Sequence, residues 1–279
     1  MKTIGIIGGT GKLGRVFDSA LSSVGYTVRV SDENSDPKQT ERVISCDWVI
    51  VCVPIGVTNA VLRDLSLKIK PHQTLTDFTS VKTPLVNEFG LFQGNVVPCH
   101  PIFGPMENVS GQNIIVIRYG KSPDTEKVIH AFKKIGLRVT ELASCEEHDR
   151  YMSIIQSLTH FMHIAFTTAL RHENPELDKI LQLCSPVYRS NFAFACRISG
   201  RDPDLYSRIL MDNPYSEKTL KNFLKHAGDI LSDVLNGDHA EFDKKFDANK
   251  TFLKDYLPKF NAESEYLVEM LTKRTSEEK

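Results

Sequence analysis

The sequence predicts an α/β fold followed by a second, all-helical domain, and three observations support this prediction. Short β-branched or apolar runs alternate with segments of helical spacing over residues 1–143. From residue 144 to residue 279 helical spacing dominates, and no convincing strand pattern occurs. The length of 279 residues also fits two domains, at about 150 residues each. We therefore expect a parallel-sheet domain over residues 1–143 and a helical domain over residues 144–279.

The first half predicts strands that alternate with helices. Residues 48–53 are apolar throughout, as in a strand that is buried on both faces. Strands and helices at such intervals are typical of βαβ units, which build a parallel sheet. Strands are expected at residues 3–7, 27–30, 48–53, 74–78, 95–99, 114–117 and 138–140, and helices at residues 12–24, 57–67 and 125–135.

The second half predicts helices only. Between residues 154 and 165, apolar side chains recur on one helix face. Glycine and proline residues separate the later helical patterns. Further helices are expected at residues 175–198, 202–211, 216–236 and 239–271.

Charge and composition exclude several classes of protein. Lys and Arg number 34 against 35 Asp and Glu, so there is no overall basic field to hold nucleic acid or an anionic membrane. No apolar stretch approaches the length of a membrane span, and the N-terminus does not resemble a signal peptide. The six cysteines show neither CxxC pairs nor zinc-ligand spacing. We therefore expect a cytoplasmic protein with reduced cysteines and no metal site.

A glycine-rich turn follows the first predicted strand. Gly9, Gly11 and Gly14 form a GxGxxG pattern that ends a strand and begins a helix. In this context glycines allow a tight turn, close approach of the backbone to a pyrophosphate, and close packing of helix on strand. The pattern predicts a Rossmann-type dinucleotide site, to which Thr10 and Leu13 of the same turn also belong.

An acidic residue in the expected place predicts which dinucleotide is bound. Asp32 lies 18 positions after Gly14, at the end of the second predicted strand. A carboxylate there accepts hydrogen bonds from the adenosine ribose and repels the 2′-phosphate of NADP. No arginine follows the strand to receive that phosphate. The sequence therefore favours NAD as the cofactor.

Three segments follow predicted strands at the edge of the sheet where ligands bind. Val53 and Pro54 end the third strand, where a cofactor would pass. Ser80 follows the fourth strand, and His100 follows the next and precedes a proline. A histidine fixed at a strand end is a candidate general base, and the Ser80 hydroxyl is a candidate to orient its ring. A loop histidine without a catalytic role is the alternative.

Several motifs, spread over nearly the whole chain, together resemble those of one known family. Besides the glycine turn they are CVPIGVT (52–58), DFTSVK (77–82), HPIFGP (100–105), EHDRYM (147–152), IQSLTHF (155–161), SPVYR (185–189), and RDPDLYSRI (201–209) just after Arg197. The chain resembles the prephenate dehydrogenase family of tyrosine biosynthesis, which also contains the arogenate dehydrogenases. The β-hydroxyacid dehydrogenases in general share only the glycine turn.

The resemblance implies an activity and a role for five side chains. Prephenate would be oxidised by NAD⁺ and decarboxylated to 4-hydroxyphenylpyruvate, in a homodimer joined through the helical domain. His100 would accept the proton of the ring hydroxyl, with Ser80 as its partner near the nicotinamide. Arg197 would hold a substrate carboxylate, and Gln156 and His160 would line the pocket.

Other interpretations stay open at this point. Arogenate dehydrogenase is the first, although the neutral side chain of Gln156 favours prephenate over the amino-bearing substrate. The second is a catalytically silent NAD-binding regulator. A metal at His160 and His163 lacks a third ligand in the sequence, and His148 and Asp149 suit capping and orientation better than catalysis. We also expect no fused chorismate mutase, although some relatives carry one.

Overall fold

The computed structural model describes residues 1–120 and 122–277 and divides the chain into two compact units. The first unit, called the sheet unit below, comprises residues 1–157 and 204–216. The second, called the helical unit, comprises residues 158–203 and 217–279. The sheet unit therefore includes residues 144–157 and 204–216 from the helical half of the sequence.

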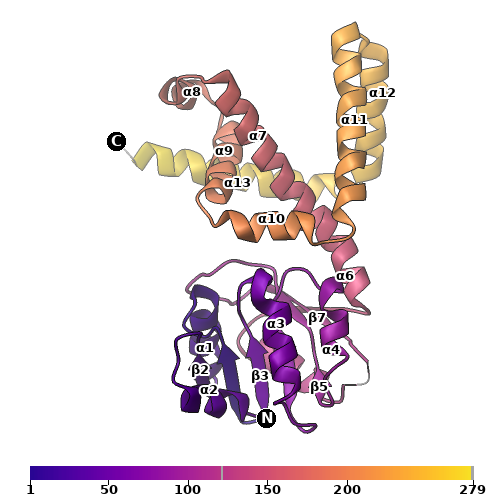
Figure 1. Cartoon of the computed structure of the whole chain (residues 1–279). Helices are drawn as coiled ribbons and strands as arrows, with labels where there is room; N and C mark the ends of the chain where they lie inside the picture. The colour runs from indigo at the N-terminus through magenta and orange to yellow at the C-terminus, as the bar shows by residue number, and fades with distance from the viewer. Residues whose placement is uncertain (121, 278–279) are drawn as a thin grey trace. The chain divides into compact units, whose positions relative to one another are not determined.

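A five-stranded parallel sheet forms the centre of the sheet unit (Figure 1). Its strands are β1 (Thr3–Ile7), β2 (Thr27–Ser31), β3 (Trp48–Val51), β4 (Thr74–Asp77) and β5 (Asn95–Val96). They lie in the order β2-β1-β3-β4-β5, and every neighbouring pair is parallel. The predicted Rossmann-type α/β fold is confirmed. The order reverses direction between β1 and β3, which places a ligand crevice at their carboxyl ends.

A second, three-stranded sheet corrects one prediction. The expected strand at residues 95–99 is two strands, because β5 ends at Val96 and β6 (Cys99–Pro101) joins β7 (Asn113–Ile117) and β8 (Arg138–Leu142). Pro98 lies between them and has no backbone N–H to donate to a sheet. The β6–β7 pair is antiparallel and the β7–β8 pair parallel, so the strands of this unit do not form one parallel sheet.

Helices cover both faces of the central sheet with two apolar cores. In β3, Trp48 and Ile50 face one core while Val49 and Val51 face the other, as the period of two in a strand requires. The first core adds residues of α1 (Lys12–Ser23) and α5 (Thr125–Lys134). The second adds residues of α3 (Ile55–Ser66), α4 (Val86–Phe89) and α6 (Cys145–Met152). The sheet is thus buried on both faces, as the continuous apolar run of β3 predicts.

The remaining helices contain two corrections. The predicted helix 175–198 breaks where Ser185 caps α9 by accepting a hydrogen bond from the Tyr188 backbone N–H. The predicted helix 239–271 breaks ahead of Pro258, which has no N–H to donate to the Lys254 carbonyl four residues earlier. A helix at 37–44 had not been predicted. The bounds are α2 (Pro37–Ile44), a 3₁₀ turn η1 (Thr83–Leu85), a π-helix η2 (Ser153–Leu158), α7 (Thr159–Glu173), α8 (Leu177–Leu183), α9 (Pro186–Ser199), α10 (Pro203–Met211), α11 (Ser216–Asn236), α12 (His239–Leu253) and α13 (Leu257–Glu277).

Among the residues described, no helix is both long enough and apolar enough to cross a membrane.

Candidate active site

The glycine turn joins β1 to α1 and leaves no room for side chains. A Cβ on Gly9 would lie 2.6 Å from the Cβ of Val30, and one on Gly14 would lie 2.4 Å from the carbonyl oxygen of Gly8. No side chain caps the N-terminus of α1, which begins after Gly11. The free backbone N–H groups of this first turn suit the phosphates of a nucleotide. Thr10 and Leu13 lie in the same segment.

Asp32 lies beside the glycine turn, directly after β2. Its carboxylate accepts hydrogen bonds from the Thr10 hydroxyl and from the Glu33 backbone N–H. These two hydrogen bonds, that of Thr10 first, lower the pKa of Asp32 from its ordinary value. The carboxylate is therefore ionised at neutral pH and able to accept hydrogen bonds from ribose hydroxyls. Asp32, Thr10 and the turn form a fitting cradle for the adenosine end of a dinucleotide.

Two strand ends meet at the point where the strand order reverses. A Cβ on Gly8, after β1, would lie 2.2 Å from the carbonyl oxygen of Cys52, after β3. Val53 and Pro54 continue from Cys52 into the first turn of α3. The two predicted cofactor-binding segments, the glycine turn and Val53-Pro54, are thus neighbours.

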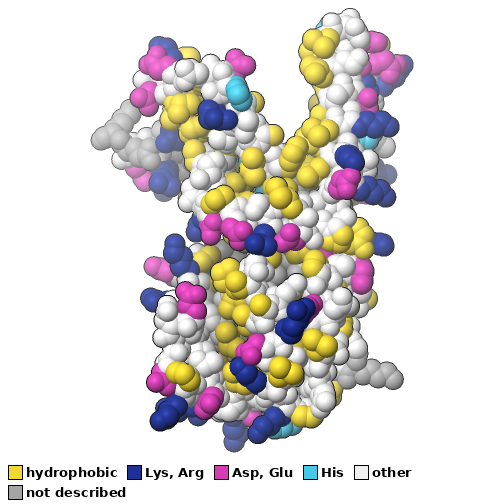
Figure 2. Space-filling view, viewed as in Figure 1, with side chains coloured by type: hydrophobic (Ala, Val, Ile, Leu, Met, Phe, Trp, Pro, Cys, Tyr) yellow, Lys and Arg dark blue, Asp and Glu magenta, His cyan; other side chains and the backbone are white. Residues whose placement is uncertain are grey.

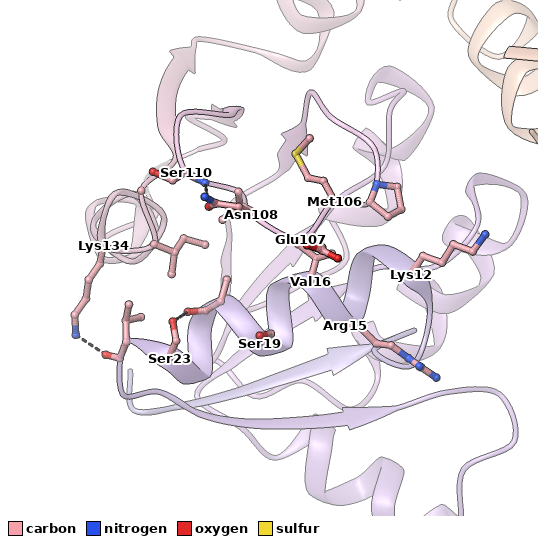
Figure 3. A pocket seen from close by; sticks show the side chains of 16 residues that line it. Lys12, Arg15, Val16, Ser19, Ser23, Met106, Glu107, Asn108, Ser110 and Lys134 are labelled. Carbon is pink, nitrogen blue, oxygen red and sulfur yellow. Dashed lines mark hydrogen bonds between the residues drawn. The ribbon is translucent and has the colours of Figure 1, made fainter. Parts of the chain in front are cut away.

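A groove of about 900 Å³ extends from the start of α1 along the outside of that helix. Figure 3 shows the 105–110 loop, which carries Met106 and Glu107, beside α1: Val16 lies next to Glu107, whereas the Lys12 and Arg15 side chains extend away from the loop. This loop continues from the HPIFGP motif. The groove therefore lies between α1 and the segment that follows the HPIFGP motif.

His100 lies in β6, and its imidazole is 2% exposed. Its Nδ1 lies 2.9 Å from Nε2 of His148 in α6. His148 Nδ1 in turn lies 2.7 Å from a carboxylate oxygen of Asp149. On the other side of the ring, the Gln156 amide nitrogen lies 3.3 Å from His100 Nε2. Two side chains far from His100 in the sequence, His148 and Gln156, thus contact the two nitrogens of its ring.

The chain of contacts determines which nitrogen atoms carry hydrogens. An ionised carboxylate only accepts, so His148 Nδ1–H donates to Asp149, and neutral His148 must accept at Nε2. His100 Nδ1–H is then the donor to His148, which leaves a lone pair on His100 Nε2. That lone pair accepts a hydrogen bond from the Gln156 amide group. A neutral imidazole with an unprotonated Nε2 is the form that a general base requires.

The pKa values agree with these protonation states. Burial, then the neighbouring His148 and the positive Lys82, lower the pKa of His100 well below 6.5. Burial likewise lowers the pKa of His148, against the opposing effect of Asp149. Burial raises the pKa of Asp149, but hydrogen bonds from His148 and Thr83 outweigh it, so the net pKa is lowered. Two neutral imidazoles next to one carboxylate follow at pH 7.

The orienting partner of His100 differs from the one expected. Ser80 is half-buried, and within the described residues its hydroxyl makes no hydrogen bond to His100, whose ring nitrogens contact His148 and Gln156. The sequence predicts an orienting role for His148 and Asp149, but it does not indicate which side chain they orient. The EHD motif marks these two residues, whereas the packing of α6 beside β6, which brings them to His100, is visible only in the structure.

Gln156 reaches His100 from the π-helical segment η2. π-Helical turns are uncommon and occur often at functional sites. Among the described residues, the Gln156 side-chain oxygen is buried and accepts no hydrogen bond. Gln156 therefore has an acceptor to offer a polar group of a ligand close to His100.

The other two predicted substrate contacts belong to the helical unit. Arg197 lies in the last turn of α9 and is exposed to solvent. His160 lies at the start of α7, where burial and then His163 lower its pKa. The site around His100 is thus assembled within the sheet unit, without these two residues.

The fold and this site define a class: a Rossmann-type, nucleotide-binding protein with a buried, neutral histidine beside the nucleotide domain's strand ends. Comparison with known proteins identifies the family within this class. Residues 14–115 match the family described as prephenate dehydrogenase, nucleotide-binding domain, and residues 144–248 match its dimerization domain. The T-protein of Enterobacter agglomerans is 30% identical over 270 residues, which cover 96% of this chain and 72% of that protein. The chain belongs to the prephenate dehydrogenase family of oxidoreductases, and the prediction of a nucleotide cofactor is confirmed.

Further relatives carry both substrate names of the family. A probable arogenate/prephenate dehydrogenase of Methanocaldococcus jannaschii is 32% identical, over 87% of this chain and 59% of that protein. A structure of prephenate dehydrogenase from A. aeolicus, in complex with hydroxyphenyl propionate and NAD⁺, matches with a TM-score of 0.74 at 21% identity, over 91% of this chain and 98% of that one. Synechocystis arogenate dehydrogenase matches with a TM-score of 0.70 at 19% identity, over 91% and 99%. These solved structures share the fold.

Proposed function

We propose that the protein catalyses the NAD-dependent oxidative decarboxylation of prephenate to 4-hydroxyphenylpyruvate. The observation that carries the proposal is the lone pair on His100 Nε2, which the His148–Asp149 pair holds unprotonated inside the nucleotide-binding unit. Family membership supplies the substrate class. The A. aeolicus relative, which shares the fold, was crystallised with NAD⁺ and an aromatic acid.

His100 has one task in this reaction, which is to take the proton of the ring hydroxyl. NAD⁺ bound at the glycine turn would supply the acceptor for the hydride from the ring carbon that bears this hydroxyl. The positive charge that His100 gains is stabilised through His148 by the ionised Asp149. Loss of CO₂ then restores an aromatic ring, which makes the overall conversion favourable.

Gln156 controls access to the lone pair of His100. In the structure its amide N–H group occupies the direction from which a hydroxyl would donate. A substrate hydroxyl replaces this N–H, and the Gln156 side chain then remains beside the reacting ring. Because Gln156 is neutral, it offers no counter-charge to the amino group of arogenate.

Arg197 is the proposed clamp for a substrate carboxylate, with His160 as a further pocket residue. A guanidinium group stays charged and grips a carboxylate with two parallel hydrogen bonds. Arg197 is exposed within the helical unit and so is accessible to a ligand. Ser80, close in sequence to the buried end of β4, is proposed to contact the nicotinamide side of the site.

NAD is the proposed cofactor because of Asp32. Its ionised carboxylate, oriented by Thr10, accepts hydrogen bonds from ribose hydroxyls and repels a 2′-phosphate. The glycine turn and the uncapped start of α1 hold the pyrophosphate. A relative from Schizosaccharomyces pombe is named as an NADP(+)-dependent prephenate dehydrogenase, but it is only 21% identical.

A homodimer through the helical unit is the proposed assembly. Residues 144–248 match a dimerization domain. Large apolar side chains are exposed along α11 and α12, and Figure 2 shows hydrophobic side chains gathered along this hairpin. They include Leu231, Val234, Leu235, Phe246 and Phe252. Exposed apolar surface of this extent is typical of an interface. Light scattering is expected to show twice the 31.4 kDa of one chain; a species of 31.4 kDa alone would contradict the proposal.

Formation of NADH tests the activity. Purified protein with NAD⁺ is given prephenate, and in a parallel reaction arogenate. We expect NADH absorbance to rise with both the enzyme and prephenate present, and more slowly with arogenate. A faster reaction with arogenate would make the protein an arogenate dehydrogenase. No NADH with either substrate, despite measurable NAD⁺ binding, would favour a regulator instead.

A further inference from the structure

Lys82 is a fully buried lysine at the base of the proposed site. It follows β4 in the DFTSVK motif, and its side chain has no exposed surface. Its ammonium group donates to a carboxylate oxygen of Asp77 at 2.6 Å and to the carbonyl oxygen of Cys99 at 2.6 Å. Cys99 is the residue directly before His100. Burying a charged pair is costly, so its presence here calls for a reason beyond packing.

The backbone of the same residue holds the other end of the histidine chain. The Lys82 backbone N–H donates to both oxygens of Asp149, at 2.9 and 3.2 Å, and the next N–H, of Thr83, donates at 2.7 Å. Lys82 thus contacts the strand that carries His100 and the carboxylate that ends the His100–His148–Asp149 chain.

The charge of Lys82 also acts on the rings. Several ionisable groups surround His100: Lys82 with Asp77 from the end of β4, Cys99 in its own strand, and His148 with Asp149 from α6. Gln156 on the remaining side is neutral. After burial, the positive charge of Lys82 contributes to the lowered pKa of both His100 and His148, and at His148 the negative Asp77 partly opposes it. A protonated Lys82 therefore opposes protonation of the base before substrate arrives.

We propose that Lys82 is a positioning residue for the base: through the Cys99 carbonyl and the Asp149 carboxylate it fixes both ends of the His100–His148–Asp149 chain. The proposal rests on the proposed role of His100. Lys82 itself does not touch the substrate, because its hydrogen bonds are directed to Asp77 and Cys99.

A charge-balanced double variant tests the proposal. Asp77→Asn with Lys82→Met removes the buried pair without leaving one charge alone, a change that proteins often tolerate. The acid limb of the pH profile of kcat/KM is expected to move up by about one pH unit, and kcat to fall about tenfold or more. In the double variant Asp77→Asn with Lys82→Gln, the new glutamine amide at position 82 can donate to the Cys99 carbonyl. We therefore expect kcat to recover in part, while the acid limb of the kcat/KM profile stays at the higher pH.

The matched control removes another ion pair of the sheet unit. Arg63 donates to the largely buried carboxylate of Glu88 at 2.8 Å, between α3 and α4. Glu88→Gln with Arg63→Met removes the same charges at a place that contacts neither histidine. This control should keep the wild-type acid limb. If either Lys82 double variant folds and keeps it too, the proposal is wrong.

A measurement without substrate separates this proposal from the proposed function. Titration of the His100 imidazole by ¹⁵N NMR reports its protonation whether or not NADH is formed. The apparent pKa of His100 is expected to rise in both Lys82 double variants and to stay unchanged in the Glu88–Arg63 control. An unchanged titration in all of them would overturn the role of Lys82, whereas absence of dehydrogenase activity in the wild type would overturn only the proposed reaction.

Discussion

The two compact units differ in whether their functional side chains are buried and hydrogen-bonded within the unit or exposed to solvent. In the sheet unit, His148, Asp149 and Lys82 are fully buried and joined by hydrogen bonds. In the helical unit, by contrast, α7, α8, α12 and α13 contain no fully buried residue among those described. Arg197 and many large apolar side chains of this unit face solvent.

This difference separates two tasks. A general base works best when its tautomer and surroundings are fixed in advance, and the sheet unit supplies both. The proposed carboxylate clamp and the proposed dimer interface must be accessible to their partners, and the helical unit leaves both exposed. Substitutions in the sheet unit should therefore affect the chemical step, and those in the helical unit should affect substrate binding or assembly.

The largest effect is expected from His100→Asn. Asparagine keeps some hydrogen bonding but cannot accept the proton, so kcat should fall by about 10²–10⁴-fold. NAD⁺ affinity, measured by titration calorimetry, should not change because the glycine turn is untouched. Steady-state activity within about threefold of wild type would remove His100 from the mechanism.

Asp149→Asn tests the chain behind the base. An amide can donate to His148 and so favour the wrong tautomers of both rings, which should lower kcat on the order of 10²-fold. KM for prephenate should change little. Thermal unfolding is the control, since Asp149 also accepts hydrogen bonds from the Lys82 and Thr83 backbone. A stable variant with normal kcat would show that the chain does not serve the base.

Arg197→Ala moves the test to the helical unit. Losing a charge-assisted, bidentate contact costs about 1.5–3 kcal/mol, so KM for prephenate should rise about 10–100-fold while kcat changes less. Lys at this position should restore binding only in part, since it lacks the planar fork. An unaltered KM would place the carboxylate clamp elsewhere, and Arg189 of the SPVYR motif would be the next arginine to test.

The smallest effect is expected at the cofactor end of the sheet unit. Asp32→Ser removes the carboxylate that repels a 2′-phosphate, so the preference for NAD⁺ over NADP⁺ should weaken by about tenfold. The ratio of kcat/KM for the two cofactors measures this. A wild-type protein that already prefers NADP⁺ would contradict the interpretation of Asp32.

Only part of this difference between the two units can be predicted from the sequence. The glycine turn, the alternating strands and Asp32 are local signals, so the fold class and the nucleotide cradle can be predicted from them. The partner of His100 is not local: His148 lies 48 residues away and reaches His100 only because α6 packs beside β6. Ser80, the nearer candidate by motif, makes no hydrogen bond to the ring within the described residues.

Other differences also come from tertiary structure or single residues. The strand break at Pro98 and the helix break before Pro258 each follow from a missing N–H, which periodicity does not register. Helix α2 is short and polar, with one fully buried residue, Val43, so its apolar pattern is weak. The buried Lys82–Asp77 pair has no sequence signal, because lysine is usually exposed.

The central claim is that the sheet unit alone holds His100 neutral, with the proton on Nδ1 and a lone pair on Nε2. ¹⁵N NMR of the histidine side chains in the wild-type protein at pH 7 tests it most directly. We expect a protonated Nδ1, an unprotonated Nε2, and a second proton only well below pH 6.5, because burial, His148 and Lys82 lower the pKa of His100. A His100 ring that is doubly protonated at pH 7, or that carries its single proton on Nε2, would contradict this assignment.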